Sequence, residues 1–202
     1  MAIIKAMAEA IRVNKDYLTE LDAAIGDADH GVNMDRGFQA VLAKLDALTS
    51  DPPCVGTILS TVGMTLVSTV GGASGPLYGT AFLYAGNVVK GKDRVSLDDA
   101  IAMLEAALAG IKKRGGAEVG DKTMVDALEP AVAYLRGPGR NETSLSSALS
   151  NAAAKAREGM ESTRPIMAVR GRASFLKERS IGHLDPGAVS CYLLLKTIAD
   201  SV

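Results

Sequence analysis

Apolar residues recur along most of the chain three or four positions apart, which is the spacing of an amphipathic α-helix. Leu97, Ile101, Leu104, Leu108 and Ile111 follow this spacing. The same pattern, with breaks at glycine, proline and capping residues, predicts eight helices and no convincing strand. Their expected bounds are 2–13, 31–48, 55–70, 77–89, 97–111, 123–135, 145–160, and 186 onward.

The connections between these helices are of two kinds. The second, fourth and sixth (50–53, 91–95 and 137–143) are ordinary turns. The first, third, fifth and seventh are unusual in length or in glycine and charge content, at 14–30, 71–76, 114–122 and 161–184. In an up-and-down bundle each connection reverses the chain direction. We therefore expect the four unusual connections to meet at one end, which would be the functional end.

Composition and charge exclude several function classes. The 202 residues suit one domain or a compact pair. The 22 basic and 23 acidic side chains nearly balance, and the basic ones do not cluster, which argues against a nucleic-acid surface. No apolar run reaches the roughly 18 residues of a membrane span, and none resembles a signal peptide. Two cysteines, Cys54 and Cys191, give no disulfide framework. We expect a cytoplasmic protein that binds neither nucleic acid nor membrane.

Three aspartates, Asp22, Asp27 and Asp29, fall within eight residues, and no lysine or arginine lies among them. Clustered carboxylates repel one another unless a cation sits between them, and desolvating them is costly. Oxygen ligands of this kind suit a hard ion such as Mg²⁺ or Ca²⁺. A solvated acidic turn with a helix cap is the alternative that this stretch alone leaves open.

The other unusual connections carry groups that suit phosphate. The glycine-rich turn at 71–75 precedes a helix and can present its N–H groups to an anion, although such glycines also allow close helix crossing. Arg172 lies between small residues, where it can reach an oxyanion or remain a solvated surface residue. His30 and His183, the only histidines, are candidate acid/base groups or metal ligands; both could equally be loop residues that form hydrogen bonds.

Two further residues complete the candidate site. Asp185 is most simply the N-cap of the last helix. Met124 is either an apolar wall for a flat ring or a core residue. Carboxylates for a metal, glycine turns and an arginine for phosphates, and apolar residues for a base together describe a magnesium–nucleotide site. Phosphoryl transfer requires positioning and charge neutralisation more than a protein nucleophile.

Five motifs, taken together and in order, span nearly the whole chain. They resemble the nucleotide-binding subunits and domains of dihydroxyacetone kinases: the ADP-binding L subunit of the bacterial phosphoenolpyruvate-dependent enzymes, and the C-terminal domain of the ATP-dependent ones. The motifs are Gly26-Asp-Ala-Asp-His-Gly31, Gly71-Gly-Ala-Ser-Gly-Pro-Leu-Tyr-Gly79, Gly120-Asp-Lys-Thr-Met124, Gly171-Arg-Ala-Ser174, and Glu178-Arg-Ser-Ile-Gly-His183 with Asp185-Pro-Gly187.

The resemblance implies one domain over residues 1–202, an all-α, eight-helix antiparallel up-and-down barrel with the nucleotide at one end. It implies that Asp22, Asp27 and Asp29 bind two Mg²⁺ ions and that Arg172 is catalytic. The implied contacts with ADP or ATP are His30, Gly31, Val32, Asn33, Ala73, Ser74, Gly115, Met124, Arg172, Asp185, Pro186 and Gly187. Asp35 has no role in this scheme.

The resemblance also implies an activity and its partners. ADP would stay bound as a cofactor and be recharged to ATP by a phosphohistidine on a phosphotransferase subunit. The γ-phosphoryl would then pass to dihydroxyacetone, held on a separate subunit, giving dihydroxyacetone phosphate. Two alternatives remain at this stage. One is the nucleotide subunit of a free-ATP kinase for a related ketose. The other is a non-catalytic module that regulates a partner such as a transcription factor.

Overall fold

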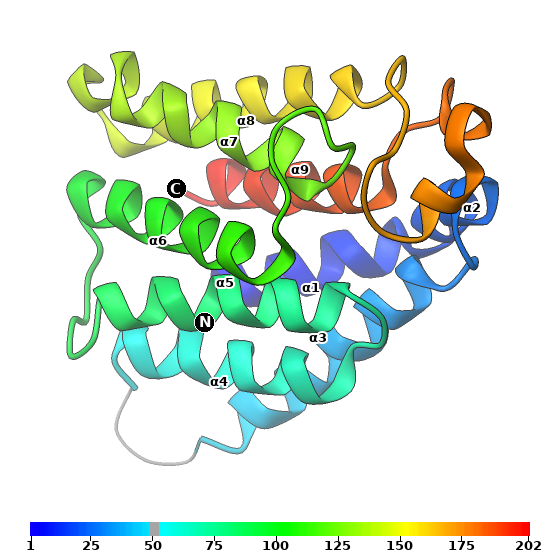
Figure 1. Ribbon diagram of the computed structural model, residues 1–202. Helices are drawn as coiled ribbons and strands as arrows, with labels where there is room; N and C mark the ends of the chain where they lie inside the picture. The colour runs from blue at the N-terminus through cyan, green and yellow to red at the C-terminus, as the bar shows by residue number, and fades with distance from the viewer. Residues whose placement is uncertain (49–52) are drawn as a thin grey trace.

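Helices form nearly all the regular structure in a computed structural model that describes residues 1–48 and 53–202 (Figure 1). This part of the chain contains no strand, so the predicted all-α class is confirmed. The α-helices are α1 (Ala2–Val13), α2 (Lys15–Ile25), α3 (His30–Asp46), α4 (Val55–Thr69), α5 (Ser74–Val88), α6 (Leu97–Gly115), α7 (Met124–Arg136), α8 (Leu145–Ser162) and α9 (Pro186–Asp200). Two 3₁₀ helices, η1 (Pro138–Asn141) and η2 (Arg172–Ser180), lie in connections.

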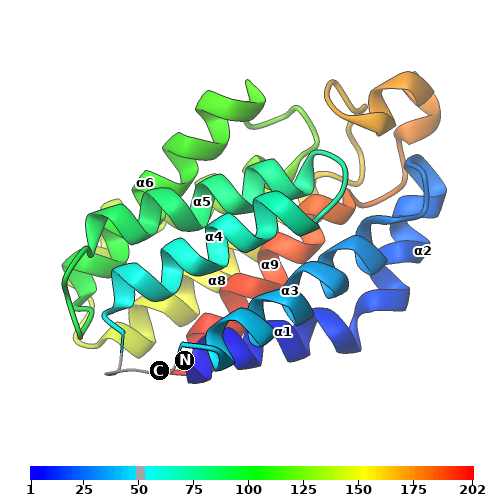
Figure 2. The same ribbon diagram turned by 90° about the horizontal axis from the view of Figure 1, so that it is seen from below.

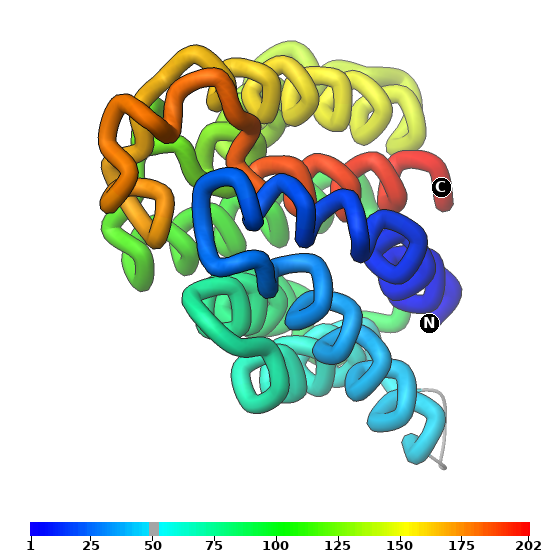
Figure 3. Tube along the Cα trace, turned by 90° about the vertical axis from the view of Figure 1, so that its right-hand side faces the viewer, coloured from blue at the N-terminus to red at the C-terminus, as the bar shows by residue number. Residues whose placement is uncertain are grey.

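One predicted connection is wrong in part, because residues 15–25 form the helix α2 and are not a loop. Backbone hydrogen bonds continue from α1 into α2, since Leu18 N–H donates to Asn14 O and Asn14 N–H to Ala10 O. The chain bends at Asn14, and α2 reaches the end of the molecule where η2 lies (Figures 1 and 3). Because the chain bends at Asn14 without reversing its direction, α1 and α2 together form one rod-like unit and take the place of the first of the eight expected helices.

These rods form a closed ring in which each packs beside its neighbours in the chain. α1 contacts α3, each later helix from α3 to α8 contacts the next, and α9 closes the ring by packing against α8 and α1. Its interior is apolar, with large buried side chains such as Phe38, Leu66 and Leu135. α4 and α5 approach closely, because a Cβ at Gly63 would lie 2.7 Å from the carbonyl oxygen of Gly79. This ring is the antiparallel up-and-down barrel that the resemblance implied.

The alternating directions bring the four unusual connections to one end, as Figure 2 shows for the segments after α2, α4, α6 and α8. The expected ordinary turns at 91–95 and 137–143 lie between α5 and α6 and between α7 and α8. The expected helix break at 50–53 falls largely on residues 49–52, which lie outside the described residues. None of the described helices combines the length and apolar character needed to cross a membrane.

Candidate functional site

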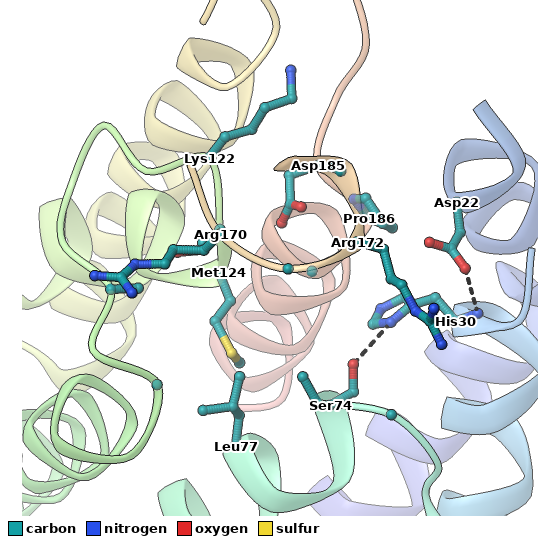
Figure 4. A pocket seen from close by; sticks show the side chains of 18 of the residues that line it. Asp22, His30, Ser74, Leu77, Lys122, Met124, Arg170, Arg172, Asp185 and Pro186 are labelled. Atoms are coloured by element: carbon teal, nitrogen blue, oxygen red, sulfur yellow. Dashed lines mark hydrogen bonds between the residues drawn. The ribbon is translucent and has the colours of Figure 1, made fainter. Parts of the chain in front are cut away.

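A pocket of about 700 Å³ opens at the end of the barrel where the four unusual connections meet. Its lining comes from all four of them (Figure 4). Small-molecule sites in proteins usually measure roughly 300–1,000 Å³. The pocket is thus large enough for a nucleotide.

The acidic cluster forms one wall of this pocket. One carboxylate oxygen from each of Asp22, Asp27 and Asp29 lies within 4.8 Å of the others. Asp22 sits at the end of α2 with only 7% of its surface exposed, and its Oδ2 accepts the N–H groups of Asp29 (2.8 Å) and His30 (3.1 Å). Gly26 is needed in this turn, because a Cβ there would lie 2.0 Å from Asp22 Oδ1. The tight turn after α2 therefore brings the three carboxylates together.

The cluster carries more negative charge than its protein partners neutralise. Arg172 Nη2 lies 3.0 Å from Asp27 Oδ2, and within the described ranges this is the one ion pair that involves the three aspartates. Two net negative charges remain, on hard oxygen donors close enough to share a cation. This donor set fits Mg²⁺, which proteins bind through one or two carboxylates with the remaining positions left to water and substrate phosphates.

A glycine turn faces the carboxylates from the start of α5. Gly72 has a φ of +64°, and a Cβ there would meet nothing within 4 Å, so the turn is open on that side. Ser74 is the first residue of α5. The backbone N–H groups in the first turn of a helix have no hydrogen-bond partners within that helix. Such groups attract phosphate oxygens.

His30 joins three helices through a buried hydrogen-bond chain. Its Nδ1 lies 3.0 Å from Ser74 Oγ at the start of α5, and its Nε2 lies 2.9 Å from Ser190 Oγ on α9. Tyr78 Oη lies 2.7 Å from the same Ser190 Oγ and donates to Gly187 O (3.2 Å). Burial lowers the pKa of His30, so the ring is neutral at pH 7, with one nitrogen donating and the other accepting. The ring thus holds the start of α5 in place, and both of its nitrogens are engaged by serine hydroxyls.

We expect His30→Ala to destabilise the fold by about 2–4 kcal/mol, because it opens a cavity and removes the hydrogen bonds that join Ser74 and Ser190 to α3. Urea unfolding of the nucleotide-free protein measures this. His183→Ala is the matched control, since His183 is exposed and, within residues 1–48 and 53–202, only its backbone carbonyl has a hydrogen-bond partner. Equal stability of the two variants would show that the hydrogen-bond chain contributes nothing.

The wall away from the carboxylates is apolar. Met124, 4% exposed at the start of α7, faces Leu77 of α5 across the pocket (Figure 4). Ile111 and Pro186 also line this part of the pocket. Gly115 keeps the slot open, because a Cβ there would lie 3.1 Å from Leu77 Cδ2. The slot is of a kind that accepts a flat ring.

Asp185 caps α9, as its place before Pro186 predicts. Its Oδ2 accepts Ala188 N–H at 2.7 Å. Burial raises the pKa of Asp185 to about 7 from its ordinary 3.8. The folded protein therefore holds this proton more tightly than the unfolded chain does. That contribution to stability is fully present below the ordinary pKa and is lost as the pH rises through about 7.

Asp185→Asn keeps a good capping residue and removes the titration. We expect its melting temperature, relative to the unmodified protein, to rise between about pH 5 and pH 8. Thermal unfolding of both nucleotide-free proteins across this range measures the difference. A difference that stays constant with pH would contradict the shifted pKa of Asp185.

The structure brings most of the predicted site residues together in this pocket. Its lining includes Asp22, Asp27, Asp29, His30, Asn33, Ala73, Ser74, Gly115, Met124, Arg172, Asp185, Pro186 and Gly187. Gly31 and Val32 are not in the lining. Gly31 has a packing role, because a Cβ there would lie 2.0 Å from Lys15 O on α2. Nucleotide contacts of Gly31 and Val32 stay predictions, as do the roles of the residues that line the pocket.

Asp35 stands apart from the acidic cluster. It accepts a hydrogen bond from Gln39 on the same helix. Sequence reasoning assigned no role to Tyr78, Ser190 or Lys122, although Tyr78 and Lys122 lie inside two of the motifs. The contacts of these three residues are made with distant parts of the chain, which no local pattern reveals.

Comparisons with known proteins agree with this geometry. The model of the DAK2 domain family matches residues 24–200. The ADP-binding subunit DhaL of PEP-dependent dihydroxyacetone kinase 2 from Listeria innocua is 42% identical over 99% of this chain and 92% of its own length. The corresponding subunit of the Escherichia coli enzyme is 45% identical over 91% of this chain and 87% of its own.

Longer kinases contain a similar unit. L-erythrulose 1-kinase of Mycolicibacterium smegmatis is 36% identical over 99% of this chain and 35% of its own length. The crystal structure of the dihydroxyacetone kinase from C. freundii in complex with AMP-PNP and Mg²⁺ superimposes with a TM-score of 0.76, at 26% identity. That alignment covers all of this chain and 33% of the C. freundii enzyme, so this chain spans about a third of it.

Proposed function

The chain belongs to the DAK2 domain family, and we propose that it is the nucleotide-binding subunit of a dihydroxyacetone kinase. It holds ADP or ATP with two Mg²⁺ ions. It passes the γ-phosphoryl group to dihydroxyacetone on a separate subunit, which gives dihydroxyacetone phosphate. One observation carries the proposal. Three carboxylates within 4.8 Å of one another share a pocket with the glycine turn before Ser74, which suits a metal beside phosphates.

Different residues of the pocket bind different parts of the metal–nucleotide complex. Asp22, Asp27 and Asp29 hold the metal, which when bound neutralises phosphate charge. The turn before Ser74 binds phosphate oxygens through N–H groups, and Met124 lines the slot for the base. Arg172 then brings a positive charge to the phosphate that is transferred, because its side chain is 71% exposed at the mouth of the pocket and can reach a bound phosphate.

The names of relatives and the state of His30 support a phosphotransferase protein as the phosphoryl donor. Curated relatives are named as PEP-dependent or PTS-dependent kinases, the latter from Lactococcus lactis at 42% identity over 96% of this chain. In this chain His30 is occupied by two serines. His183 is not among the residues that line the pocket. Both facts support a phosphohistidine that is carried by a phosphotransferase partner and not by this subunit.

Exposed apolar side chains around the mouth support docking of the ketone-bearing subunit. Val119, Met167, Val169, Phe175 and Ile181 are all exposed on the connections at this end. Phe175 lines the pocket and is 82% exposed. Exposed apolar groups gathered at one place mark interaction surfaces. The acceptor must reach the phosphates through this mouth, so its subunit is the partner that the surface fits.

Reconstitution tests the proposal and its alternatives. We expect product when the protein is mixed with a ketone-binding subunit and a phosphohistidine-bearing phosphotransferase, at catalytic ADP and without added ATP. Formation of product only with stoichiometric ATP would favour a free-ATP kinase. Rates with dihydroxyacetone and with erythrulose should be compared to identify the ketose, since erythrulose kinases are among the relatives. No transfer under either condition would contradict the kinase assignment and favour a regulatory module. A transcription-factor partner and a cytoplasmic location remain part of the proposal.

A further inference from the structure

Lys122 is a charged side chain buried inside the protein. Only 1% of its surface is exposed. It lies in the turn between α6 and α7, with a φ of +64°. Its backbone is at the edge of the pocket, while its ammonium points away from the pocket (Figure 4). Burying an ammonium is costly unless other groups replace its water, so its partners must be strong.

Those partners are backbone carbonyls. The ammonium donates to the carbonyl oxygens of His183 (2.6 Å), Thr163 (2.7 Å), Ser180 (2.9 Å) and Ile166 (3.1 Å). In the parts of the chain that the structure describes, Lys122 forms no ion pair with a carboxylate. Three N–H groups are shared by four oxygens, and carbonyl oxygens can replace the hydration shell of a cation, as they do in potassium-channel filters.

The four carbonyls come from both ends of one segment. Thr163 and Ile166 leave α8, while Ser180 and His183 return toward α9, so the ammonium closes this loop at its base. Other hydrogen bonds close the same base: Gly182 N–H donates to Arg164 O at 2.8 Å, Ala168 N–H to Ser180 Oγ at 2.9 Å and Asp185 N–H to Thr163 Oγ1 at 3.1 Å. The tip of the loop carries Arg172, which reaches across to Asp27.

The same lysine belongs to the opposite wall of the pocket. Thr123 N–H and Gly120 N–H donate to the carboxylate of Asp126, which fixes the turn around Lys122 at the start of α7. Met124 follows directly in the chain. Lys122 thus sets the position of the loop with Arg172 relative to the helix with Met124.

From this geometry we propose that Lys122 is a positioning residue: its ammonium holds the loop of residues 163–183 so that Arg172 meets the nucleotide phosphates. The proposal rests on the proposed function. It predicts that Lys122 acts on phosphoryl transfer through Arg172 and on the order of this loop directly.

The test compares Lys122→Met, Arg172→Ala and the double variant. Lys122→Met keeps the unbranched stem and removes the charge. We expect it to weaken ADP binding and to slow single-turnover transfer by about tenfold or more, since misplaced catalytic groups can cost about 10²-fold. We expect little added loss of transfer rate in the Arg172→Ala background, because residues in one network are not additive. Lys177→Met, an exposed lysine on the same loop, is the control and should match the unmodified protein.

A second measurement needs no nucleotide. Hydrogen exchange of Lys122→Met should be faster for amides at 163–183, with α4 and α5 unchanged. Three results would overturn the proposal. These are additive losses of transfer rate in the double variant, unchanged hydrogen exchange at 163–183, and loss of cooperative unfolding in Lys122→Met, which would mean that Lys122 supports the whole fold. If the unmodified protein binds no ADP but the loop still loosens, the proposed function fails while the role of Lys122 in the loop stands.

Discussion

We expect Asp29→Asn to abolish retention of ADP at micromolar free Mg²⁺ and to leave the melting temperature of the nucleotide-free protein unchanged. Asp29 supplies one of three clustered carboxylates, and its side chain makes no capping hydrogen bond at the start of α3. Its replacement thus removes a charge from the metal site at little cost to the fold. Changes in groups that merely support metal ligands cost about 10–100-fold in affinity, so loss of a ligand should cost at least as much.

Calorimetric titration with Mg²⁺ and ADP measures this loss. Asp35→Asn is the matched control, because it removes the same charge from α3, the helix that Asp29 directly precedes, at a residue outside the cluster. We expect it to bind like the unmodified protein. Comparable weakening by both changes would mean that general charge, and not a metal site, controls binding.

Arg172→Ala is expected to slow phosphoryl transfer by about 10²-fold or more, since removal of one preorganised donor to a developing charge has that effect. The arginine is exposed, and among the described residues it forms one ion pair, with Asp27. Exposed ion pairs contribute about 0–1 kcal/mol to stability, so the melting temperature should barely change. Binding of ADP should weaken less than transfer does.

Single-turnover transfer to the ketone subunit, together with thermal unfolding, separates these effects. Arg179→Ala is a suitable control, because Arg179 is exposed on the same loop. Arg172→Lys should recover little, since lysine lacks the planar fork that binds two phosphate oxygens. A drop in melting temperature that accounts for the lost activity would instead make Arg172 a structural residue.

The fold was accessible from the sequence because helical spacing and end signals are local. The same locality explains the error at α2, whose apolar stripe is short and lies among charged residues such as Lys15, Asp16 and Glu20. The bend at Asn14 does not reverse the chain, so the inference that four connections meet at one end survived this error. Family resemblance supplied the barrel closure that periodicity alone does not determine.

The site was accessible only in part. The acidic cluster could be recognised because Asp22, Asp27 and Asp29 lie close together in the sequence with no lysine or arginine among them. Its partner Arg172 could not, because it comes from a connection near the other end of the chain. Lys122 binds backbone carbonyls, which every residue has, so no residue pattern marks its acceptors. Contacts of this kind are fixed by tertiary packing, and the sequence is silent on them.

Retention of nucleotide by the purified protein tests the central claim most directly. Protein prepared in Mg²⁺ is denatured, and the released nucleotide is quantified by mass spectrometry against protein. The account predicts ADP and protein in about equal molar amounts, loss of ADP after EDTA treatment, and its return when ADP and Mg²⁺ are added together. Protein that carries no nucleotide, even with ADP and Mg²⁺ in excess, would contradict it.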